Sequence, residues 1–279
     1  MQLCIKLLVL SDIHNNLVAV RRMRDREPNA FDAVVVAGDI GSACAPRFFE
    51  ILSTFKCPVL YVYGNWDHEL EYGTAFAGDA HHLHLNVVEI GGYFFTGFSG
   101  CPTKWGKNPI ALKLGDLPDA ARQTLHLNRT ALRRTIAPFD PRRTVIITHE
   151  RLTKLTDVAA DPLLHLYGHL HGFSERMAGA TRCVNVSVLD RAVTARPQGT
   201  GAYERTELRN FNAGNYVIIE ISDPGGIRVE CRQLPHDYPQ WTPLKDRRHN
   251  GIEWIPEELK WTDPTDPKIA RYQESLSDK

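Results

Sequence analysis

The sequence lacks an excess of charge of either sign. Its 33 basic and 33 acidic residues cancel over 279 residues, so no net field concentrates a polyanion such as duplex nucleic acid at the surface. Dedicated binding of duplex nucleic acid is therefore disfavoured. Hydrophobic residues make up 43% of the chain and charged residues 24%, which is typical of a globular protein and excludes the disordered and fibrous classes.

Long apolar runs are also lacking. The N-terminal stretch 3–10 is interrupted by Lys6 and stops at Ser11 and Asp12, so it is too short for a membrane-spanning helix. It is not followed by a small-residue cleavage site. We therefore expect no membrane association and a cytoplasmic location.

Paired cysteines are missing as well, because none of the six cysteines belongs to a C-x-x-C motif. Most lie in apolar runs, where a free thiol behaves as a small hydrophobe, and we interpret them as reduced core thiols. They are Cys4, Cys44, Cys57, Cys101, Cys183 and Cys231. The chain also has no Walker loop, no G-x-S-x-G elbow and no cysteine-histidine signature, which excludes the mechanisms that depend on them.

Five short apolar runs are near-continuous, as expected of strands covered on both faces. They read KLLVL, AVVVAG, VLYVYG, TVIIT and LLHLYG. Helical patterns lie between the first three runs, at about 16–27 and 46–55, and before the fourth, at about 119–136. The alternation of strands and helices predicts an α/β protein with a mainly parallel sheet.

The pattern changes after His171. Runs at 181–189, 215–221 and 226–233 are typical of hairpin strands, and we expect a second sheet, packed on the first, to use them. The polar stretch 190–214 predicts a long loop, and such loops are usually functional or mobile.

We divide the chain into a domain at 1–234 and a C-terminal Pro/Trp-rich arm at 235–279. The arm has three tryptophans within 241–261, and large aromatic residues are depleted in segments that stay unfolded. We therefore predict an ordered arm docked on the body or on a partner subunit, which would make a homo-oligomer. Pro267 suits a first helical position and predicts a closing helix of about three turns.

Five polar segments directly follow the five apolar runs. They are Asp12-Ile13-His14, Gly38-Asp39, Gly64-Asn65-Trp66-Asp67, Thr148-His149 and Gly168-His169-Leu170-His171. Residues beyond the carboxyl ends of the strands of an open α/β sheet line one crevice, so we expect these segments to converge. Two carboxylates, one amide oxygen and four imidazoles are too many for one tetrahedral ion. They suit two octahedral or five-coordinate ions that share a bridging carboxylate.

Each segment alone has an ordinary structural explanation. Asp12 and His14 after a strand are typical of a helix N-cap beside an incidental histidine. Gly38-Asp39 is typical of a turn, and a single His149 is typical of a satisfied or surface imidazole. The order and strand-end placement of all five segments together favour metal binding over these explanations.

In this order the segments resemble the motifs of the calcineurin-like metallophosphoesterase superfamily, D-x-H, G-D, G-N-H-D/E, H and G-H-x-H, over residues 3–190. The resemblance implies a four-layer α/β/β/α sandwich with two mixed β-sheets. It implies two divalent or trivalent transition-metal ions (Mn, Fe, Zn, Ni or Co). Asp12, His14, Asp39 and His171 would hold one ion, and Asp39, Asn65, His149 and His169 the other. Two such ions lower the pKa of a bridging water, and the hydroxide attacks phosphorus in line.

Trp66 stands where the family motif has a histidine that is thought to hydrogen-bond the phosphate or to protonate the leaving group. An indole N–H donates a hydrogen bond but cannot titrate as an acid. Metal binding is expected to survive this change, which instead bears on how the leaving group departs. Some superfamily members that lack the histidine are described as phosphodiesterases. By resemblance the catalytic positions are Asp39, Asn65, Trp66 and Asp67.

Several neighbours of the motifs have two interpretations. His68 could replace the missing acid, but a solvated histidine at a helix start fits it better. Glu150 and Arg151 either face the crevice, with Arg151 as a phosphate clamp, or lie on the surface. His81, His82 and His84 match no family position and are interpreted as flanking a strand.

These features predict a two-metal hydrolase of small-molecule phosphate esters or nucleotides, with diesters preferred. A phosphomonoesterase or a nucleotide pyrophosphatase is the alternative. A catalytically silent interaction module is a distant alternative, because loss of activity would erode the ligands first and none is eroded. Loops around the crevice set specificity, so the motifs do not identify the substrate.

Overall fold

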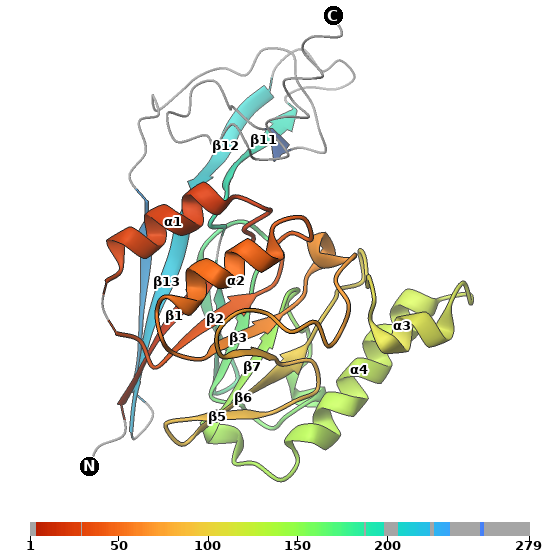
Figure 1. The fold of residues 1–279 in the computed structure, drawn as a ribbon. Helices are drawn as coiled ribbons and strands as arrows, with labels where there is room; N and C mark the ends of the chain where they lie inside the picture. Colours follow the sequence, from red (N-terminus) through yellow and green to blue (C-terminus); the bar gives the residue numbers. More distant parts are fainter. Residues whose placement is uncertain are drawn as a thin grey trace, which may run out of the picture.

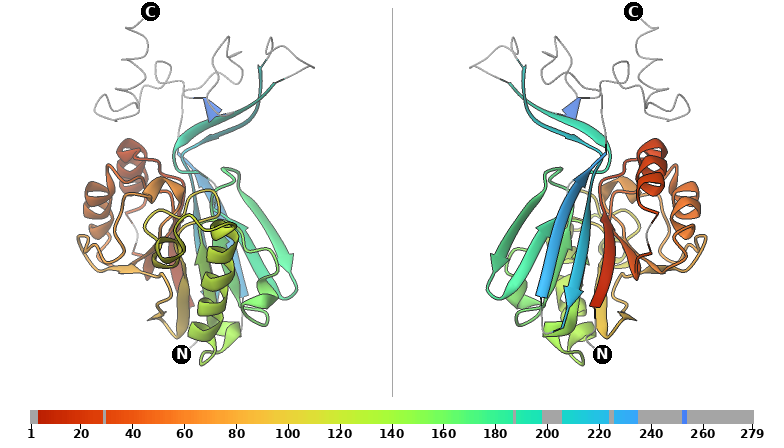
Figure 2. Two further views of the ribbon diagram at one scale, coloured as in Figure 1. Left: turned by 90° about the vertical axis from the view of Figure 1, so that its right-hand side faces the viewer. Right: turned by 90° about the vertical axis from the view of Figure 1, so that its left-hand side faces the viewer.

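The computed structural model describes residues 4–28, 30–186, 188–197, 206–223, 226–234 and 252–253. Two six-stranded sheets face each other, with helices on their outer sides (Figure 1 and Figure 2). Both sheets mix parallel and antiparallel pairs. The predicted architecture of two mixed sheets is therefore confirmed.

The first sheet contains β1 (Cys4–Leu10), β2 (Ala33–Ala37), β3 (Val59–Val62), β4 (Ala80–His82), β13 (Asn215–Ser222) and β14 (Gly226–Gln233). Their spatial order is β14-β13-β1-β2-β3-β4. The strands from β1 to β4 are parallel, and β13 pairs antiparallel with β1. The carboxyl ends of β1, β2 and β3 therefore lie at one edge of the sheet.

The second sheet contains β5 (Val88–Ile90), β6 (Tyr93–Phe98), β7 (Thr144–Thr148), β8 (Leu164–Tyr167), β9 (Ser174–Ala178) and β10 (Thr181–Asn185). Their spatial order is β5-β6-β7-β8-β10-β9. The pairs from β6 to β10 are parallel, and β5 and β9 pair antiparallel at the two edges.

The helices are α1 (Leu17–Arg26), α2 (Ala45–Ser53), α3 (Pro109–Leu114) and α4 (Ala120–Ile136), with short 3-10 turns at Asn65–Asp67, Pro141–Arg143 and Leu155–Asp157. The sequence predicted α1, α2 and α4 to within two residues but not α3. Asn16 caps α1, because its side chain accepts a hydrogen bond from the amide of Ala19 and so satisfies a free donor of the first turn.

Alternate residues of the strands build separate cores, which fixes the order of the layers. Leu8 of β1 packs with α1 and α2, whereas Leu7 packs between the two sheets. In the second sheet Ile147 joins the core between the sheets, and Ile146 packs against Leu132 of α4. Successive side chains of a strand point to opposite faces, so a strand between two layers must be apolar throughout. The order is α/β/β/α.

Two expectations about the sheets were wrong. The runs at 215–221 and 226–233 form β13 and β14, which extend the first sheet beside β1 instead of building the second. The TVIIT and LLHLYG runs form β7 and β8 of the second sheet, with β4, β5 and β6 between them and β3 in the sequence. The five ligand-bearing strands are therefore divided between two sheets. Continuous apolar runs show that both faces are covered, but not by which layer.

The predicted loop at 190–214 was also wrong. β11 (Arg191–Pro197) and β12 (Thr206–Ala213) form an antiparallel ribbon that projects beyond the two sheets (Figure 2). β15 (Ile252–Glu253) pairs with β11. The rest of the arm at 235–279 lies outside the described residues, as does the helix expected at Pro267, so the domain boundary and the docking of the arm stay predictions.

All six cysteines are free thiols, as expected. The expectation that they belong to the core holds for Cys101 and Cys183 and is wrong for Cys4 and Cys231, which are exposed. Within the described ranges, no helix combines the length and the apolar character needed to cross a membrane.

Candidate metal centre

The loops that follow β1, β2, β3, β7 and β8 meet at one end of the facing sheets, where the carboxyl ends of the parallel strands lie. They bring together all seven predicted ligands, which are Asp12, His14, Asp39, Asn65, His149, His169 and His171. Asp12 and His149 are fully buried, and His14 and Asp39 are 1% exposed. The two sheets thus supply one shared site.

One group of ligand atoms surrounds the carboxylate of Asp12. Its Oδ1 lies 3.3 Å from His171 Nε2 and 3.8 Å from His14 Nε2. The ligand atoms of these three residues all lie within 4.8 Å of one another. Mixed imidazole and carboxylate ligands at this spacing could hold a transition-metal ion.

A second group surrounds Asn65, whose Oδ1 lies 3.1 Å from His149 Nε2 and 3.1 Å from His169 Nδ1. Asp39 stands between the two groups. Its Oδ2 lies 3.3 Å from His14 Nε2 of the first group and 3.3 Å from His149 Nε2 of the second. A single carboxylate in contact with both groups has the position that a bridging ligand requires.

The hydrogen-bond pattern fits a cation, because lone pairs face one another across the site. The Ala37 carbonyl can only accept, so His149 Nδ1, at 2.9 Å, carries the proton. Asp190 Oδ2, at 3.1 Å, fixes the same tautomer of His14. With the rings neutral, as metal ligands require, Nε2 of each would turn a lone pair toward Asp39, and a metal ion between them would satisfy both sides.

The electrostatics of the ligand cluster lead to the same conclusion. Burial raises the pKa of Asp39, but the neighbouring His149 and His14 outweigh burial and hold that pKa well below its usual range. Burial lowers the pKa of His149, yet the Asp39 carboxylate outweighs burial and raises the pKa well above the usual histidine value. The pocket therefore favours an ionised Asp39 carboxylate and positive charge beside it.

The backbone of the site is strained. Positive φ angles are uncommon for residues with a side chain and cluster at functional sites. Five of the predicted ligands adopt them, namely Asp12 (52°), His14 (50°), Asp39 (55°), His169 (68°) and His171 (52°). Gly64 leaves room for the Asp39 carboxylate, because a Cβ at Gly64 would collide with it. The surrounding packing therefore holds these loops in conformations that aim the side chains inward.

A model of the calcineurin-like phosphoesterase superfamily domain matches residues 5–207. The chain belongs to this superfamily. The match covers every loop that carries a predicted ligand, so the pattern read from the sequence and the family assignment agree. No curated protein matches the sequence.

Solved structures share the fold at low identity. One crystal structure aligns with a TM-score of 0.52 at 14% identity, over 84% of this chain and 100% of that chain. TT1561 of Thermus thermophilus aligns with a TM-score of 0.49 at 17% identity, over 81% and 98%. Zinc-complexed Vps29 of Entamoeba histolytica aligns with a TM-score of 0.34 at 15% identity, over 82% and 99%. At these identities the likeness concerns the fold alone.

Asp190 is a polar residue of the site that sequence analysis missed. It is fully buried, accepts a hydrogen bond from Asn16 Nδ2 at 2.9 Å, and orients His14 through its other oxygen. The amide of Asp190 also binds the Asp12 carbonyl at 3.1 Å. Asp190 lies 176 residues after His14, just before β11, in a stretch interpreted as a loop, so no local pattern connects the two.

Asp67 binds the backbone of two loops of the predicted metal site. Its two oxygens accept hydrogen bonds from the amides of Gly41 and Gly64, each at 2.7 Å. Burial and the nearby Asp39 raise the pKa of Asp67 to about 6. The predicted catalytic residue Asp67 therefore contacts backbone amides of two ligand-bearing loops, and it is 2% exposed.

Trp66 lies at the mouth of the site. It is 38% exposed, and its ring centroid is 4.7 Å from that of His14. His68 Nδ1 is buried without a hydrogen-bond partner, and Nε2 lies 3.7 Å from Glu69. No described contact links His68 to a predicted ligand, so the structure does not favour it as the acid.

Cys101 was interpreted from sequence as a core thiol, and the structure places it against the site. It is 1% exposed, and its Sγ lies 3.5 Å from Asn65 Oδ1. Burial raises the pKa of this thiol, so it stays protonated near neutral pH. The signal that could have found it is its position just after β6, a strand that sequence analysis missed.

The other candidates differ in their relation to the ligands. Glu150 has a buried carboxyl oxygen without a partner, and its charge acts on the ligand His169, whose pKa it raises against the larger effects of burial and His149. Burial and the charge of Arg176 lower the pKa of His165, and the charge of Arg151 adds to this effect. In the sequence, His165 lies between two apolar residues of β8 that face the first sheet. His82 belongs to β4 itself, and His84 Nδ1 accepts from the Ser99 amide at 3.2 Å. The prediction that these histidines flank a strand was therefore wrong for His81 and His82, which belong to β4, and holds for His84, which lies two residues beyond its end. None of the three joins the predicted ligand set.

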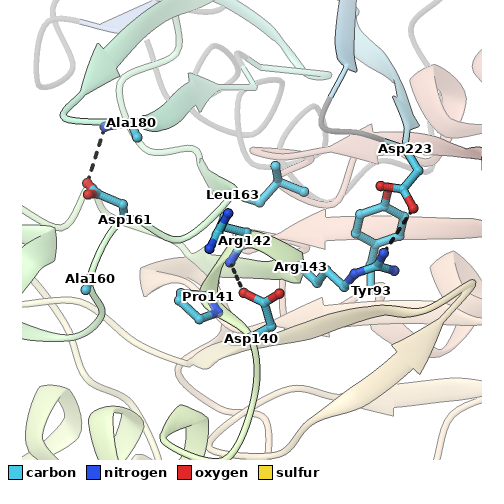
Figure 3. A pocket seen from close by; sticks show the side chains of 10 residues that line it. All are labelled: Tyr93, Asp140, Pro141, Arg142, Arg143, Ala160, Asp161, Leu163, Ala180 and Asp223. Atoms are coloured by element: carbon cyan, nitrogen blue, oxygen red, sulfur yellow. Dashed lines mark hydrogen bonds and ion pairs between the residues drawn. The ribbon is translucent and has the colours of Figure 1, made fainter.

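A separate cavity of about 630 Å³ lies at the amino ends of β6, β7 and β8 (Figure 3). None of the seven predicted ligands lines it. Arg143 pairs with Asp223 at 3.0 Å, and Asp161 accepts from the Ala180 amide at 3.2 Å. These charged groups are paired with other groups of the protein. The residues that line the cavity offer no counterpart to the predicted metal-ligand cluster.

Proposed function

We propose that this chain is a two-metal hydrolase of phosphate esters that prefers diesters. The position of Asp39 carries the proposal. One oxygen of this buried carboxylate contacts an imidazole from each of two ligand groups, which is the arrangement needed for two ions that share a bridge. The other oxygen accepts the Trp66 amide at 2.8 Å, so the bridge is held from both sides.

The metal ions, when bound, supply a water of lowered pKa and positive charge for the phosphate oxygens. The chain supplies the rest by position. Burial of Asp12, Asp39 and His149 excludes water and strengthens the local field. The tautomers of His14 and His149 are set by Asp190 and by a carbonyl, so neither ring must reorganise before binding.

The chain offers no nucleophile of its own at this site. Ser11 is fully buried, and its hydroxyl donates to Asp12 Oδ2 at 2.7 Å. Burial keeps the Cys101 thiol protonated by raising its pKa. Attack by water, without a covalent intermediate on the protein, is therefore the reaction that these side chains support.

Trp66 favours diesters over monoesters. Its indole lies beside His14, where an acid would protonate the departing oxygen, and it cannot give up a proton. A diester carries one negative charge less than a monoester dianion, so an attacking hydroxide meets less charge repulsion at phosphorus. The alternatives remain a phosphomonoesterase and a nucleotide pyrophosphatase. The interaction module stays distant, since all seven ligand positions keep metal-binding side chains.

A substrate panel tests the proposal. Purified protein would be stripped with a chelator, reloaded with Mn, Zn, Ni, Co or Fe, and assayed on phosphomonoesters, linear and cyclic diesters and nucleoside diphosphate derivatives. We expect hydrolysis only after reloading, and fastest with diesters. Equal rates with and without metal would overturn the two-metal mechanism. Faster hydrolysis of monoesters or pyrophosphates would replace the diester preference with the corresponding alternative.

A further inference from the structure

Trp66 combines exposure with a fixed position beside a predicted metal ligand. Its amide donates to Asp39 Oδ1 at 2.8 Å. Its carbonyl accepts from the Ser42 amide at 3.2 Å and from the Ser42 hydroxyl at 3.0 Å. Both backbone groups are therefore held, which leaves only the side-chain torsions to move. A rigid aromatic side chain loses little entropy when a ligand packs on it.

The indole borders the metal centre on one side and solvent on the other. Its ring lies 4.7 Å from that of His14 at an interplanar angle of 43°, and His14 in turn lies 5.0 Å from His171. Exposed apolar side chains occur singly on any protein surface and need no explanation. Trp66 differs because its ring lies against the imidazole of a predicted ligand, so a phosphate held near His14 lies close to the indole.

We propose that the exposed face of Trp66 is a stacking subsite for a planar ring carried by the substrate, such as an aryl group or a nucleobase. The subsite rests on the proposed phosphoesterase function, since the phosphate places the ring. Every aromatic ring offers a flat face, so stacking is tolerant of ring identity. The substrate class is then phosphate esters whose alcohol bears a planar ring.

Two simpler roles of Trp66 compete with stacking. The indole N–H could donate a hydrogen bond to a phosphate oxygen, or the ring could only shield His14 from water. Trp66→Phe separates the first role from stacking, because phenylalanine keeps an aromatic face and lacks the N–H. Trp66→Leu separates the second, because leucine keeps an apolar cover and lacks the flat face.

The test measures binding without hydrolysis. Phenylphosphonate and cyclohexylphosphonate carry six-carbon rings on a phosphorus–carbon bond that the proposed reaction does not cleave, and only the first ring is flat. The methylenephosphonate analogues of adenosine 5′-monophosphate and of ribose 5-phosphate form a second pair, with and without a base. Isothermal titration calorimetry on Mn-loaded full-length protein would give the dissociation constants, with methylphosphonate as the reference for the anionic group alone.

We expect the flat member of each pair to bind more tightly by about 5- to 150-fold, the range for one base on an aromatic side chain. Trp66→Leu should remove most of this ratio and leave methylphosphonate binding and metal content unchanged. Trp66→Phe should keep most of it. The control Phe173→Leu removes an aromatic side chain of the same exposure, 38%, just beyond the last ligand, and should leave the ratio unchanged.

Each outcome decides between the hypotheses. Equal binding of flat and non-flat ligands, or a ratio that survives in Trp66→Leu, overturns the subsite. Loss of the ratio in Phe173→Leu instead moves the ring to another surface and also overturns it. If Trp66→Leu loses metal, Trp66→Phe and Trp66→Gln decide, because only phenylalanine keeps the stacking face. A ratio that depends on Trp66 in a protein that hydrolyses no ester would refute the proposed function and leave the subsite standing.

Discussion

At the scale of single residues, the site depends on side chains held in costly conformations. The ligands at Asp12, His14 and Asp39 have positive φ angles, and each such conformation costs on the order of 1–3 kcal/mol. Local sequence does not favour these angles in aspartate and histidine beyond a modest enrichment. The strain persists because hydrogen bonds from neighbouring loops hold it, for example from the Asp12 amide to the Gly38 carbonyl at 3.1 Å.

Asp39 gives the sharpest residue-level prediction. Because its carboxylate contacts both ligand groups, Asp39→Ala should remove activity and most of the bound metal together. The matched variant His68→Ala should keep its metal, since no described contact joins His68 to a ligand. Elemental analysis of both proteins after loading and gel filtration measures the difference. Full occupancy by two ions in the Asp39 variant would refute the bridging assignment.

Trp66 predicts a steep dependence of rate on leaving-group pKa, since the departing oxygen must carry its own charge. Aryl diesters should react faster than alkyl diesters. Trp66→His should flatten the dependence by raising the rates of alkyl diesters at least about tenfold. This is a cautious figure, because general acid catalysis typically contributes more than tenfold. The kcat/KM values of a graded ester series measure it, and Trp66→Gln, which has no acid, serves as the control. Equal chemical-step rates for alkyl and aryl esters in the unmodified protein would show that another residue supplies the acid.

Asp190 predicts a loss of metal affinity without loss of a ligand. Its carboxylate fixes the His14 tautomer from a distance of 3.1 Å, and removal of such partners typically weakens metal binding by about 10- to 100-fold. Asp190→Ala should show this loss in a titration against a chelator of known affinity. Asp161→Ala, an exposed aspartate in the cavity at the opposite end, should not. Unchanged affinity in Asp190→Ala would show that His14 is oriented without it.

At the scale of elements, a partly buried ion pair joins the end of α1 to the edge of the first sheet. Glu27, 1% exposed, follows α1 and lies 2.6 Å from Arg232 Nη1 of β14. Tyr216 of β13 donates to the same carboxylate at 2.7 Å. The pair connects α1 to β13 and β14. Only the tertiary structure brings these two strands beside β1. It explains how a hairpin about 200 residues later in the sequence is anchored there.

Breaking this pair should destabilise the protein strongly. Arg232→Leu leaves the Glu27 carboxylate buried without its counter-charge, which typically costs about 3 kcal/mol or more in the free energy of unfolding. Glu230→Gln removes only the exposed partner of the same arginine and should cost less than about 1 kcal/mol. Urea denaturation at neutral pH measures both. Equal effects of the two substitutions would mean that Glu27 finds other compensation.

At the scale of the whole molecule, partly buried neutral histidines should make stability depend on pH. Burial lowers the pKa of His82 to about 3 and that of His84 to about 4, against a usual value near 6.5. Above about pH 6.5 both histidines are neutral in the folded and unfolded states, so they do not change stability. Below it the unfolded state takes up protons that the folded state refuses, so the free energy of unfolding falls as the pH drops toward about 4.

Substitution of His82 tests this origin of the pH dependence. The fall in unfolding free energy between about pH 7 and pH 5 should be smaller by about 2 kcal/mol in His82→Gln than in the unmodified protein. His81→Gln replaces an exposed neighbour in the same strand, 39% exposed at the side chain, and should leave the fall unchanged. Denaturation in the presence of a chelator keeps metal binding out of the comparison. An unchanged fall in His82→Gln would place the sensitivity elsewhere.

The sequence predicted the elements better than their arrangement. The boundaries of α1 and α4 follow from apolar periodicity, which is local, and they agree with the structure to within one residue. The sheet to which a strand belongs depends on which apolar faces meet. The run of β7 was expected in the first, mainly parallel sheet and that of β13 in a second sheet, yet each joined the other one. The sequences of β11 and β12 are polar and show no strong apolar alternation, so these strands were mistaken for a loop.

The sequence by itself determined the types, order and strand-end positions of the seven predicted ligands and the replacement of the motif histidine by Trp66, because these are properties of short segments. Tertiary structure decided which atoms meet. It divided the ligand-bearing strands between two sheets, placed Asp39 between two groups of imidazoles, and brought Asp190 to His14 and Cys101 to Asn65. Such contacts join residues far apart in the chain, and they depend on the packing of whole layers, which no local pattern encodes.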